Sequence, residues 1–242
     1  MVWLHSTWTS NIAKLVATIL AVSCVSPSKL RNKLYMAGQP HYMEGIDISN
    51  HQKAINWEQC TPGRSGKDFV IAKATEGATY QDPMFGQNVS GARAAGFSRI
   101  GGYHFVRFGS SAPTAQMDNF VRQISDVGLL EDKEAIIALD VEEHTMADYT
   151  IVGSVVEICV RYLKAMHITP YIYTRTSFWN AHVAVTPDIV KECPLWIARW
   201  RDVPPSPEEL PRGWDLWTIW QYASKGQVPG IIGDVDLNRM IR

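Results

Sequence analysis

The 242-residue sequence contains few cysteines, and they lie far apart. Cys24, Cys60, Cys159 and Cys193 form no close pair and have no histidine at metal-ligand spacing, which excludes a disulfide-rich scaffold and argues against a metal site. We interpret Cys159, which sits in an apolar helical pattern, as a small buried hydrophobe. A disulfide between Cys60 and Cys193 stays open.

The chain also lacks an excess of either charge. It has 23 Lys+Arg against 24 Asp+Glu and no local basic cluster, so we exclude a nucleic-acid binder, which needs a basic surplus to neutralise phosphates. Hydrophobic residues make up 46% of the chain, which excludes a disordered protein and supplies the core of one large domain or two small ones. The chain contains nine tryptophans and nine tyrosines, and this high aromatic content needs an explanation.

Residues 1–43 differ from the rest of the chain. An apolar run at residues 15–25 follows Lys14; it is shorter than the roughly 20 residues of a membrane-spanning helix but has the length of the core of a secretory signal. Against a signal, the first 13 residues contain no Lys or Arg. Two interpretations stay open: export or a weak membrane anchor, and a non-functional extension with Met36 or Met43 as the start of a cytoplasmic product.

From Glu44 onward, short β-rich runs alternate with helical patterns. This alternation is typical of a β/α barrel, an α/β fold. Residues 44–242 come close to about 200 residues, the lower limit for that fold, so we predict an irregular TIM-like barrel with some helices missing or shortened. The predicted strands are residues 45–49, 69–74, 100–105, 135–141, 170–173, 195–200 and 217–222, with a short last strand near Val235.

Two acidic residues lie on one face of the predicted strand 135–141 and its extension. Strand alternation places Asp140 and Glu142 together, opposite an apolar face. Desolvating two neighbouring carboxyls makes it costly to ionise both, so one holds a proton while the other stays charged. Cleavage of a glycosidic bond requires this division of roles. A strand end that simply becomes polar as it reaches solvent is the alternative for an isolated Asp-x-Glu.

Other strand ends carry further acids. Asp47 lies at the end of the first predicted strand, and we place Asp236 at the end of the last. A barrel brings its first and last strands side by side, so both acids are expected to meet Asp140 and Glu142 at the C-terminal mouth, where the active sites of such barrels lie. Convergence of four acids favours a catalytic site over isolated caps and turns.

The order of these segments closely resembles the glycoside hydrolase family 25 lysozymes, the Chalaropsis-type muramidases found among phage endolysins and bacterial autolysins. The resemblance runs from about Glu44 to the C-terminus. It is carried by Gly45-Ile-Asp-Ile-Ser49 with Gln52, Ile55-Asn-Trp57, Phe69-Val-Ile-Ala-Lys-Ala-Thr-Glu-Gly77, Asp82, Phe85, Asn88, Ala92-Arg-Ala-Ala-Gly96, Gly102-Tyr-His-Phe105, Leu139-Asp-Val-Glu142, Tyr171-Ile-Tyr173, Leu195-Trp-Ile-Ala-Arg199, Trp220-Gln-Tyr222 and Val235-Asp-Leu-Asn238.

The resemblance implies an N-acetylmuramidase that cleaves the β-1,4 bond between N-acetylmuramic acid and N-acetylglucosamine in peptidoglycan. Glu142 matches the family's proton donor, and Asp140 the neighbouring acid that orients or charge-stabilises the acetamido group. Asp47 and Asp236 match the remaining active-site carboxylates. Both a glycosyl-enzyme and an oxazolinium intermediate remain compatible with these residues. A glycosidase acting on another amino-sugar polymer such as chitin, and an inactive glycan-binding module, are the alternative functions.

Aromatic residues on predicted strands have two roles open to them, core packing and stacking on sugar rings. Tyr103, Tyr173 and Trp220 match family positions near the mouth and are the preferred substrate contacts, with Asn238 as a polar one. We interpret His104 as a packing residue rather than a general base. The resemblance implies no cofactor. We expect a monomer that binds peptidoglycan glycan strands without a separate wall-binding module and acts on the cell wall, either secreted or held in a host cytoplasm until lysis if phage-encoded.

Overall fold

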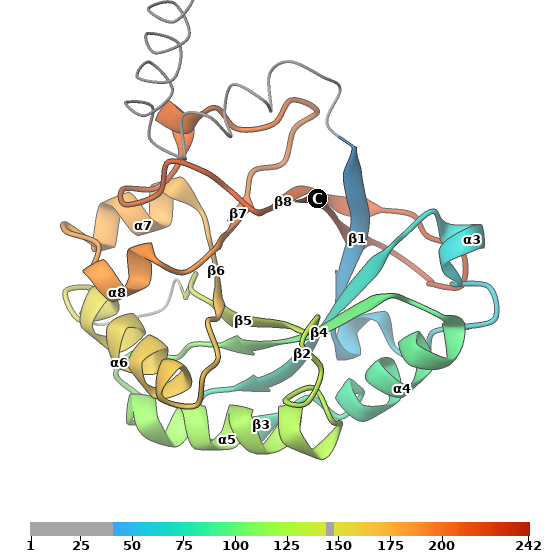
Figure 1. Cartoon of the computed structure of the whole chain (residues 1–242), viewed down its shortest axis with the longest axis horizontal. Helices are drawn as coiled ribbons and strands as arrows, with labels where there is room; N and C mark the ends of the chain where they lie inside the picture. Colours follow the sequence, from blue (N-terminus) through green and yellow to red (C-terminus); the bar gives the residue numbers. More distant parts are fainter. Residues whose placement is uncertain (1–40, 144–147) are drawn as a thin grey trace, which may run out of the picture. The chain divides into compact units, whose positions relative to one another are not determined.

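The computed structural model describes residues 41–143 and 148–242 (Figure 1). Most of the stretch interpreted as a signal, anchor or extension therefore lies outside the described residues. Its last residues do not, because Tyr42 and Met43 already belong to the first strand of the barrel. Within the described ranges, none of the helices is long and apolar enough to cross a membrane.

Eight strands close into a barrel, which confirms the fold predicted from the sequence. The strand order is β1-β9-β8-β7-β6-β5-β4-β2, and pairing of β1 with β2 closes the ring. Seven of these strands run parallel to one another. The barrel strands are β1 (Tyr42–Ile48), β2 (Phe69–Glu76), β4 (Arg99–Phe105), β5 (Ile136–Asp140), β6 (Tyr171–Thr174), β7 (Leu195–Ala198), β8 (Ile219–Gly226) and β9 (Val235–Ile241).

The last strand, β9, runs antiparallel to both of its neighbours, β8 and β1. The sequence analysis placed Asp236 at the end of the last strand. This was wrong, because Asp236 is the second residue of β9. An antiparallel strand presents its N-terminal end where its neighbours present their C-terminal ends, and Asp236 pairs in register with Asp47 of β1. The reversed direction still delivers this acid to the C-terminal mouth.

Helices cover the barrel unevenly, as its short length predicts. In Figure 1, the three long helices α4 (Phe85–Ala95), α5 (Pro113–Asp126) and α6 (Val152–Ala165) lie along one side of the ring, away from β7, β8 and β1. The connection after β6 holds only α7 (Thr176–His182) and α8 (Asp188–Lys191). The remaining short elements among the described residues are α3 (Pro62–Ser65), the hairpin strand β3 (Tyr80–Gln81), and the 3₁₀ turns η1 (Asn50–Gln52) and η2 (Pro207–Glu209).

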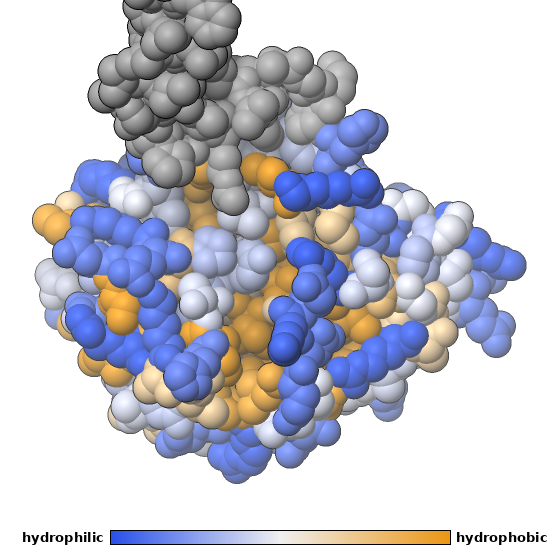
Figure 2. All heavy atoms as spheres, viewed as in Figure 1, coloured by the Kyte–Doolittle hydropathy of each residue, from blue (hydrophilic) through white to orange (hydrophobic). Residues whose placement is uncertain are grey.

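Alternate residues of each strand fill the barrel interior. Phe69 and Ile71 of β2 point inward and are fully buried against Ile136 of β5 and Trp196 of β7. Figure 2 shows apolar surface gathered at the centre of the viewed face and hydrophilic side chains around it. Strands β4 and β5 approach so closely that a Cβ at Gly101 would lie 2.2 Å from the carbonyl oxygen of Ile136, which requires glycine at that position.

The cysteines within the described residues are free thiols, so the bridge between Cys60 and Cys193 does not form. Burial raises the pKa of Cys60 to about 11 and that of Cys159 and Cys193 to about 12. Cys159 faces inward from α6, as its apolar helical pattern predicts. All three thiols are therefore unreactive packing groups at neutral pH.

Candidate active site

A cavity of about 80 Å³ opens at the carboxyl ends of the parallel strands, and the structure brings all four predicted acids to it. Two of the predicted substrate contacts, Tyr103 and Tyr173, line it as well. Trp196 and Gln221, which were not among the predicted site residues, complete the lining. The complete lining consists of Asp47, Tyr103, Asp140, Glu142, Tyr173, Trp196, Gln221 and Asp236.

Asp47 is the most firmly held of the acids. Its Oδ2 accepts hydrogen bonds from Nδ2 of Asn238 at 2.7 Å and from Nε2 of Gln221 at 3.0 Å. Burial, followed by the charge of Asp236 and then of Glu142, raises the pKa of Asp47 well above its usual range, and the two amide hydrogen bonds oppose this rise only in part. Asp47 is thus biased towards its protonated form.

Asp140 ends β5 and is 7% exposed. Burial and the charge of Glu142 raise its pKa well above the usual range, while Lys73 opposes the rise. Its Oδ1 is buried and has no hydrogen-bond partner among the described residues. Glu142 lies two residues further along the chain, and a fifth of its side chain is exposed. Its Oε2 lies 3.1 Å from Nη2 of Arg175. The two carboxyls of the Asp-x-Glu pair therefore have different surroundings, one buried and one partly exposed.

Asp236 completes the acidic cluster. Burial and the charges of Glu142 and Asp234 raise its pKa to about 6, and a hydrogen bond with Asp47 and the charge of Arg175 work against the rise. A carboxyl with a raised pKa in the folded state stabilises the fold only below its unfolded pKa of 3.8, and this contribution is lost as pH rises to about 6. The ionised cluster is thus a source of instability at neutral pH.

We therefore expect Asp236→Asn to raise the free energy of unfolding by about 1–3 kcal/mol at pH 7.5 but to change it little at pH 3.5, because the amide removes a charge that the fold disfavours. Urea unfolding followed by circular dichroism at both pH values measures the difference. Asp215→Asn, at an exposed aspartate, is the matched control. An equal effect of Asp236→Asn at both pH values would contradict the assignment of the instability to charge.

Aromatic rings and amides form the floor beneath the acids. Trp196 packs edge-on against Tyr103 and Tyr173, with ring centroids 6.4 and 4.8 Å apart. Its indole N–H donates a 2.8 Å hydrogen bond to Oδ1 of Asn238, and the Tyr173 hydroxyl donates to Oε1 of Gln221 at 3.1 Å. Since both amides also hold Asp47, the floor fixes the position of that acid.

Two predicted substrate contacts lie outside the cavity lining. Trp220 is fully buried, and its indole N–H donates to the carbonyl oxygen of Arg199 at 2.7 Å. Asn238 is also fully buried and acts behind Asp47. On β8, Ile219 faces the barrel interior, so alternation places Gln221 at the cavity and Trp220 on the other face. The sequence contains this alternation but does not say which face points inward.

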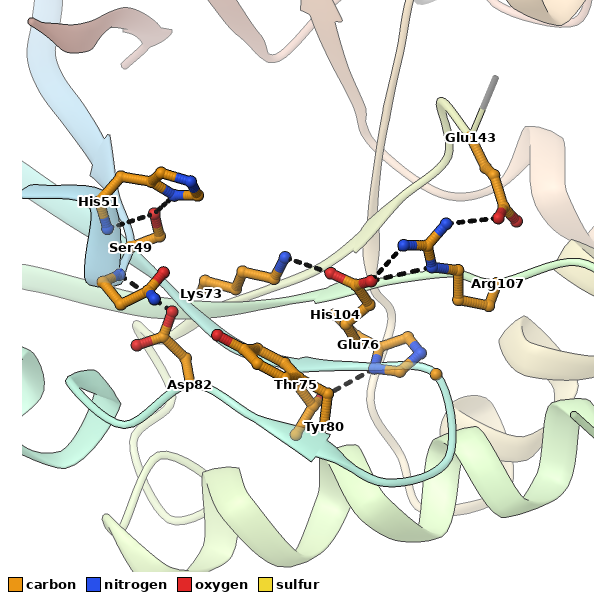
Figure 3. A network of polar contacts seen from close by, with 12 residues as sticks. Ser49, His51, Lys73, Thr75, Glu76, Tyr80, Asp82, His104, Arg107 and Glu143 are labelled. Carbon is orange, nitrogen blue, oxygen red and sulfur yellow. Dashed lines mark hydrogen bonds and ion pairs between the residues drawn. The ribbon is translucent and has the colours of Figure 1, made fainter. Parts of the chain in front are cut away.

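A series of linked ion pairs flanks the site next to β2 and β4 (Figure 3). Nζ of Lys73 lies 2.6 Å from Oε2 of Glu76, and the Arg107 guanidinium joins Oε1 of Glu76 to Oε1 of Glu143. The second carboxylate oxygen of Glu143 accepts a 2.7 Å hydrogen bond from the backbone N–H of Phe108. Glu143 therefore faces away from the cavity and anchors the backbone that carries Glu142.

His104 is a packing residue, as the sequence predicts. It is fully buried, with Nδ1 2.7 Å from the Thr75 hydroxyl and Nε2 3.1 Å from Oε1 of Gln116 (Figure 3 shows the contact with Thr75). Burial lowers its pKa to about 4, so the ring stays neutral. No group of three His, Cys, Asp or Glu residues within the described part of the chain is arranged to hold a metal ion.

Comparisons with known proteins point to one family. The family described as "Glycosyl hydrolases family 25" matches residues 46–231. Lysozyme M1 of Streptomyces globisporus is 33% identical over 205 residues, which cover 81% of this chain and 67% of the relative. The N,O-diacetylmuramidase of Chalaropsis is 30% identical over 213 residues, covering 80% and 96%. The crystal structure of the bacterial lysozyme from Streptomyces coelicolor superposes with a TM-score of 0.73 at 32% identity, covering 82% of this chain and 91% of that one.

Proposed function

Because the chain belongs to glycosyl hydrolase family 25 and is therefore a glycosidase, we propose that it cleaves the β-1,4 bond between N-acetylmuramic acid and N-acetylglucosamine in peptidoglycan, with Glu142 as general acid. The observation that carries the proposal is the convergence of four carboxyls on one cavity at the carboxyl ends of the barrel strands. Burial and mutual repulsion keep several of them from ionising at once.

The two carboxyls of the Asp-x-Glu pair take different roles in this proposal. Glu142 is the more exposed of the two, so it can reach the glycosidic oxygen and protonate it as the bond breaks. Asp140 lies deeper and has a raised pKa and an oxygen without a partner in the described protein, which suits an interaction with the substrate's acetamido group. That acetamido oxygen can then serve as the internal nucleophile in place of a protein carboxylate.

Asp47 and Asp236 lie opposite each other on neighbouring strands and supply negative charge near the developing oxocarbenium ion when they ionise. Tyr103 and Tyr173 offer ring faces and edges to the sugar from the cavity wall. We propose that the protein acts as a monomer. The proposed substrate places the site of action at the cell wall.

Digestion of purified peptidoglycan and of chitin in parallel tests the proposal. We expect mass spectrometry to find new reducing ends at N-acetylmuramic acid in the peptidoglycan digest, with much slower release of oligosaccharides from chitin. Equal or faster release from chitin would move the substrate to a neutral amino-sugar polymer. Sedimentation of the protein with peptidoglycan without any release of sugar would show a binding module instead.

A further inference from the structure

A guanidinium lies at the rim of the cavity. Arg175 directly follows β6, whose Tyr173 pairs in register with Asp140 of β5, so the residues two positions further along, Arg175 and Glu142, meet at the mouth. Nη2 of Arg175 lies 3.1 Å from Oε2 of Glu142, and 36% of the arginine side chain is exposed. The cation is therefore held at the site but remains accessible to a ligand.

An exposed indole lies beneath this guanidinium. Trp200 is 52% exposed, and the guanidinium carbon of Arg175 is 4.9 Å from the centre of its ring. The indole N–H donates a 2.9 Å hydrogen bond to Oε1 of Gln221, which also lines the cavity. A large aromatic ring that is both exposed and fixed to a catalytic cavity is placed to stack on a sugar.

Arg175 also has a hydrogen-bond donor that no described residue of the protein uses. Its Nε is buried and has no hydrogen-bond partner among the described residues. Arg107, in contrast, uses Nε, Nη1 and Nη2 on Glu76 and Glu143. Lys73, the other cation near the cavity acids, is paired with Glu76 at 2.6 Å. Compared with Arg107 and Lys73, Arg175 therefore keeps more hydrogen-bonding capacity for a ligand.

The charge of the cavity makes such a cation necessary for an anionic substrate. Those of the four cavity carboxyls that are ionised repel any further carboxylate. In addition, the guanidinium of Arg175 lies 3.1 Å from Oε2 of Glu142, and its charge also acts on Asp140 and Asp236. A substrate anion that engages the guanidinium overcomes this repulsion, because it gains a positively charged partner beside the acids.

We infer that Arg175 and Trp200 form a subsite for a carboxylate-bearing sugar, in which the indole stacks on the sugar ring and the guanidinium binds the carboxylate. The inference rests on the proposed function and deepens it, because it makes Arg175 the residue that selects an anionic amino-sugar chain over a neutral one. In peptidoglycan this chemistry has two sources, the lactyl carboxylate of muramic acid residues that carry no stem peptide and the carboxylates of the stem peptide itself.

Three oligosaccharides of equal length separate these sources: neutral chitotetraose, a disaccharide-repeat tetramer with free lactyl carboxylates, and the same tetramer with stem peptides. We expect Arg175→Gln to lower kcat/KM for the carboxylate-bearing substrates by about 10- to 100-fold more than for chitotetraose, the value of a charge-assisted contact. A loss confined to the tetramer without peptides assigns the lactyl carboxylate, because attachment of the stem peptide converts that group into an amide. A loss on both muramic substrates shows that the subsite accepts either carboxylate. A loss confined to the peptide-bearing tetramer assigns the stem peptide.

Arg175→Lys keeps the positive charge but not the planar guanidinium. Its kcat/KM for the carboxylate-bearing substrates should therefore lie between those of the wild type and of Arg175→Gln. Arg122→Gln, at an exposed arginine of α5, is the matched control. An equal loss on all three substrates, or no loss on any, would overturn the inference, because the role of Arg175 would then be independent of substrate charge. Failure of the wild-type enzyme to cleave either muramic substrate would instead refute the proposed function.

Discussion

Glu142→Gln is expected to lower kcat for peptidoglycan cleavage by about 10²- to 10⁴-fold, the contribution of a positioned general acid. Glutamine has nearly the same size as glutamate and still fits beside Arg175, but it cannot deliver a proton to the leaving oxygen. Release of reducing ends from purified peptidoglycan measures the effect. A variant that keeps more than about a tenth of the wild-type kcat would remove Glu142 from the acid role.

A second substrate separates loss of the acid from general damage. With an aryl glycoside whose leaving group departs without a proton, the loss in Glu142→Gln should be much smaller than with peptidoglycan. Glu134→Gln makes the same chemical change at an exposed carboxylate before β5 and should leave both rates unchanged. Equal losses on both substrates would indicate that Glu142 acts in substrate binding or in the shape of the site rather than as the proton donor.

The largest effect on stability is expected at Trp196. The side chain is 2% exposed, fills the barrel interior and makes edge contacts with Tyr103 and Tyr173. Trp196→Ala should lower the free energy of unfolding by about 3–5 kcal/mol, since it removes buried apolar area and leaves a cavity that the closed barrel cannot collapse to fill. Urea unfolding followed by circular dichroism at pH 7.5 measures this loss.

Trp196→Phe separates packing from hydrogen bonding at the same position. Phenylalanine retains most of the ring contacts but loses the indole N–H that holds Oδ1 of Asn238, leaving that buried oxygen without its partner. We expect a smaller loss, about 1–3 kcal/mol, together with reduced activity, because Asn238 also positions Asp47. Ile232→Ala, at an 89% exposed side chain, is the control. A loss below about 1 kcal/mol in Trp196→Ala would contradict the role assigned to this core.

Local patterns in the sequence predict the strands and place Asp140 and Glu142 on one side of β5. The nearness of Asp47 and Asp236 follows from barrel closure, which makes the first and last strands neighbours. The placement of Asp236 at the end of its strand was wrong, because a seven-residue strand such as β9 has the same alternation whichever way it runs. Strand direction is decided by the connection from β8 and by pairing with β1, which are distant in the sequence.

Strand alternation also leaves undecided which aromatic residues face the cavity. In the segment around Trp220 and Gln221, alternation separates the two residues, but the inward face is set by the packing of Ile219 against the barrel interior. The resemblance to the family favours the tryptophan as the sugar contact, and the structure places the glutamine at the cavity instead. Trp196 lies on a fully buried strand whose residues are apolar on both faces, so its pattern predicts burial without a direction.

By itself, the sequence determined the barrel, the four acids and their common edge, because strand periodicity and the closure of a barrel are rules that hold without knowing individual contacts. Only the tertiary structure decided which side chains surround those acids. Asn238 reaches Asp47 from 191 positions away, and Arg175 meets Glu142 from the next strand. Such contacts depend on strand direction, register and inward face together, and burial among these partners sets the charge state of each acid.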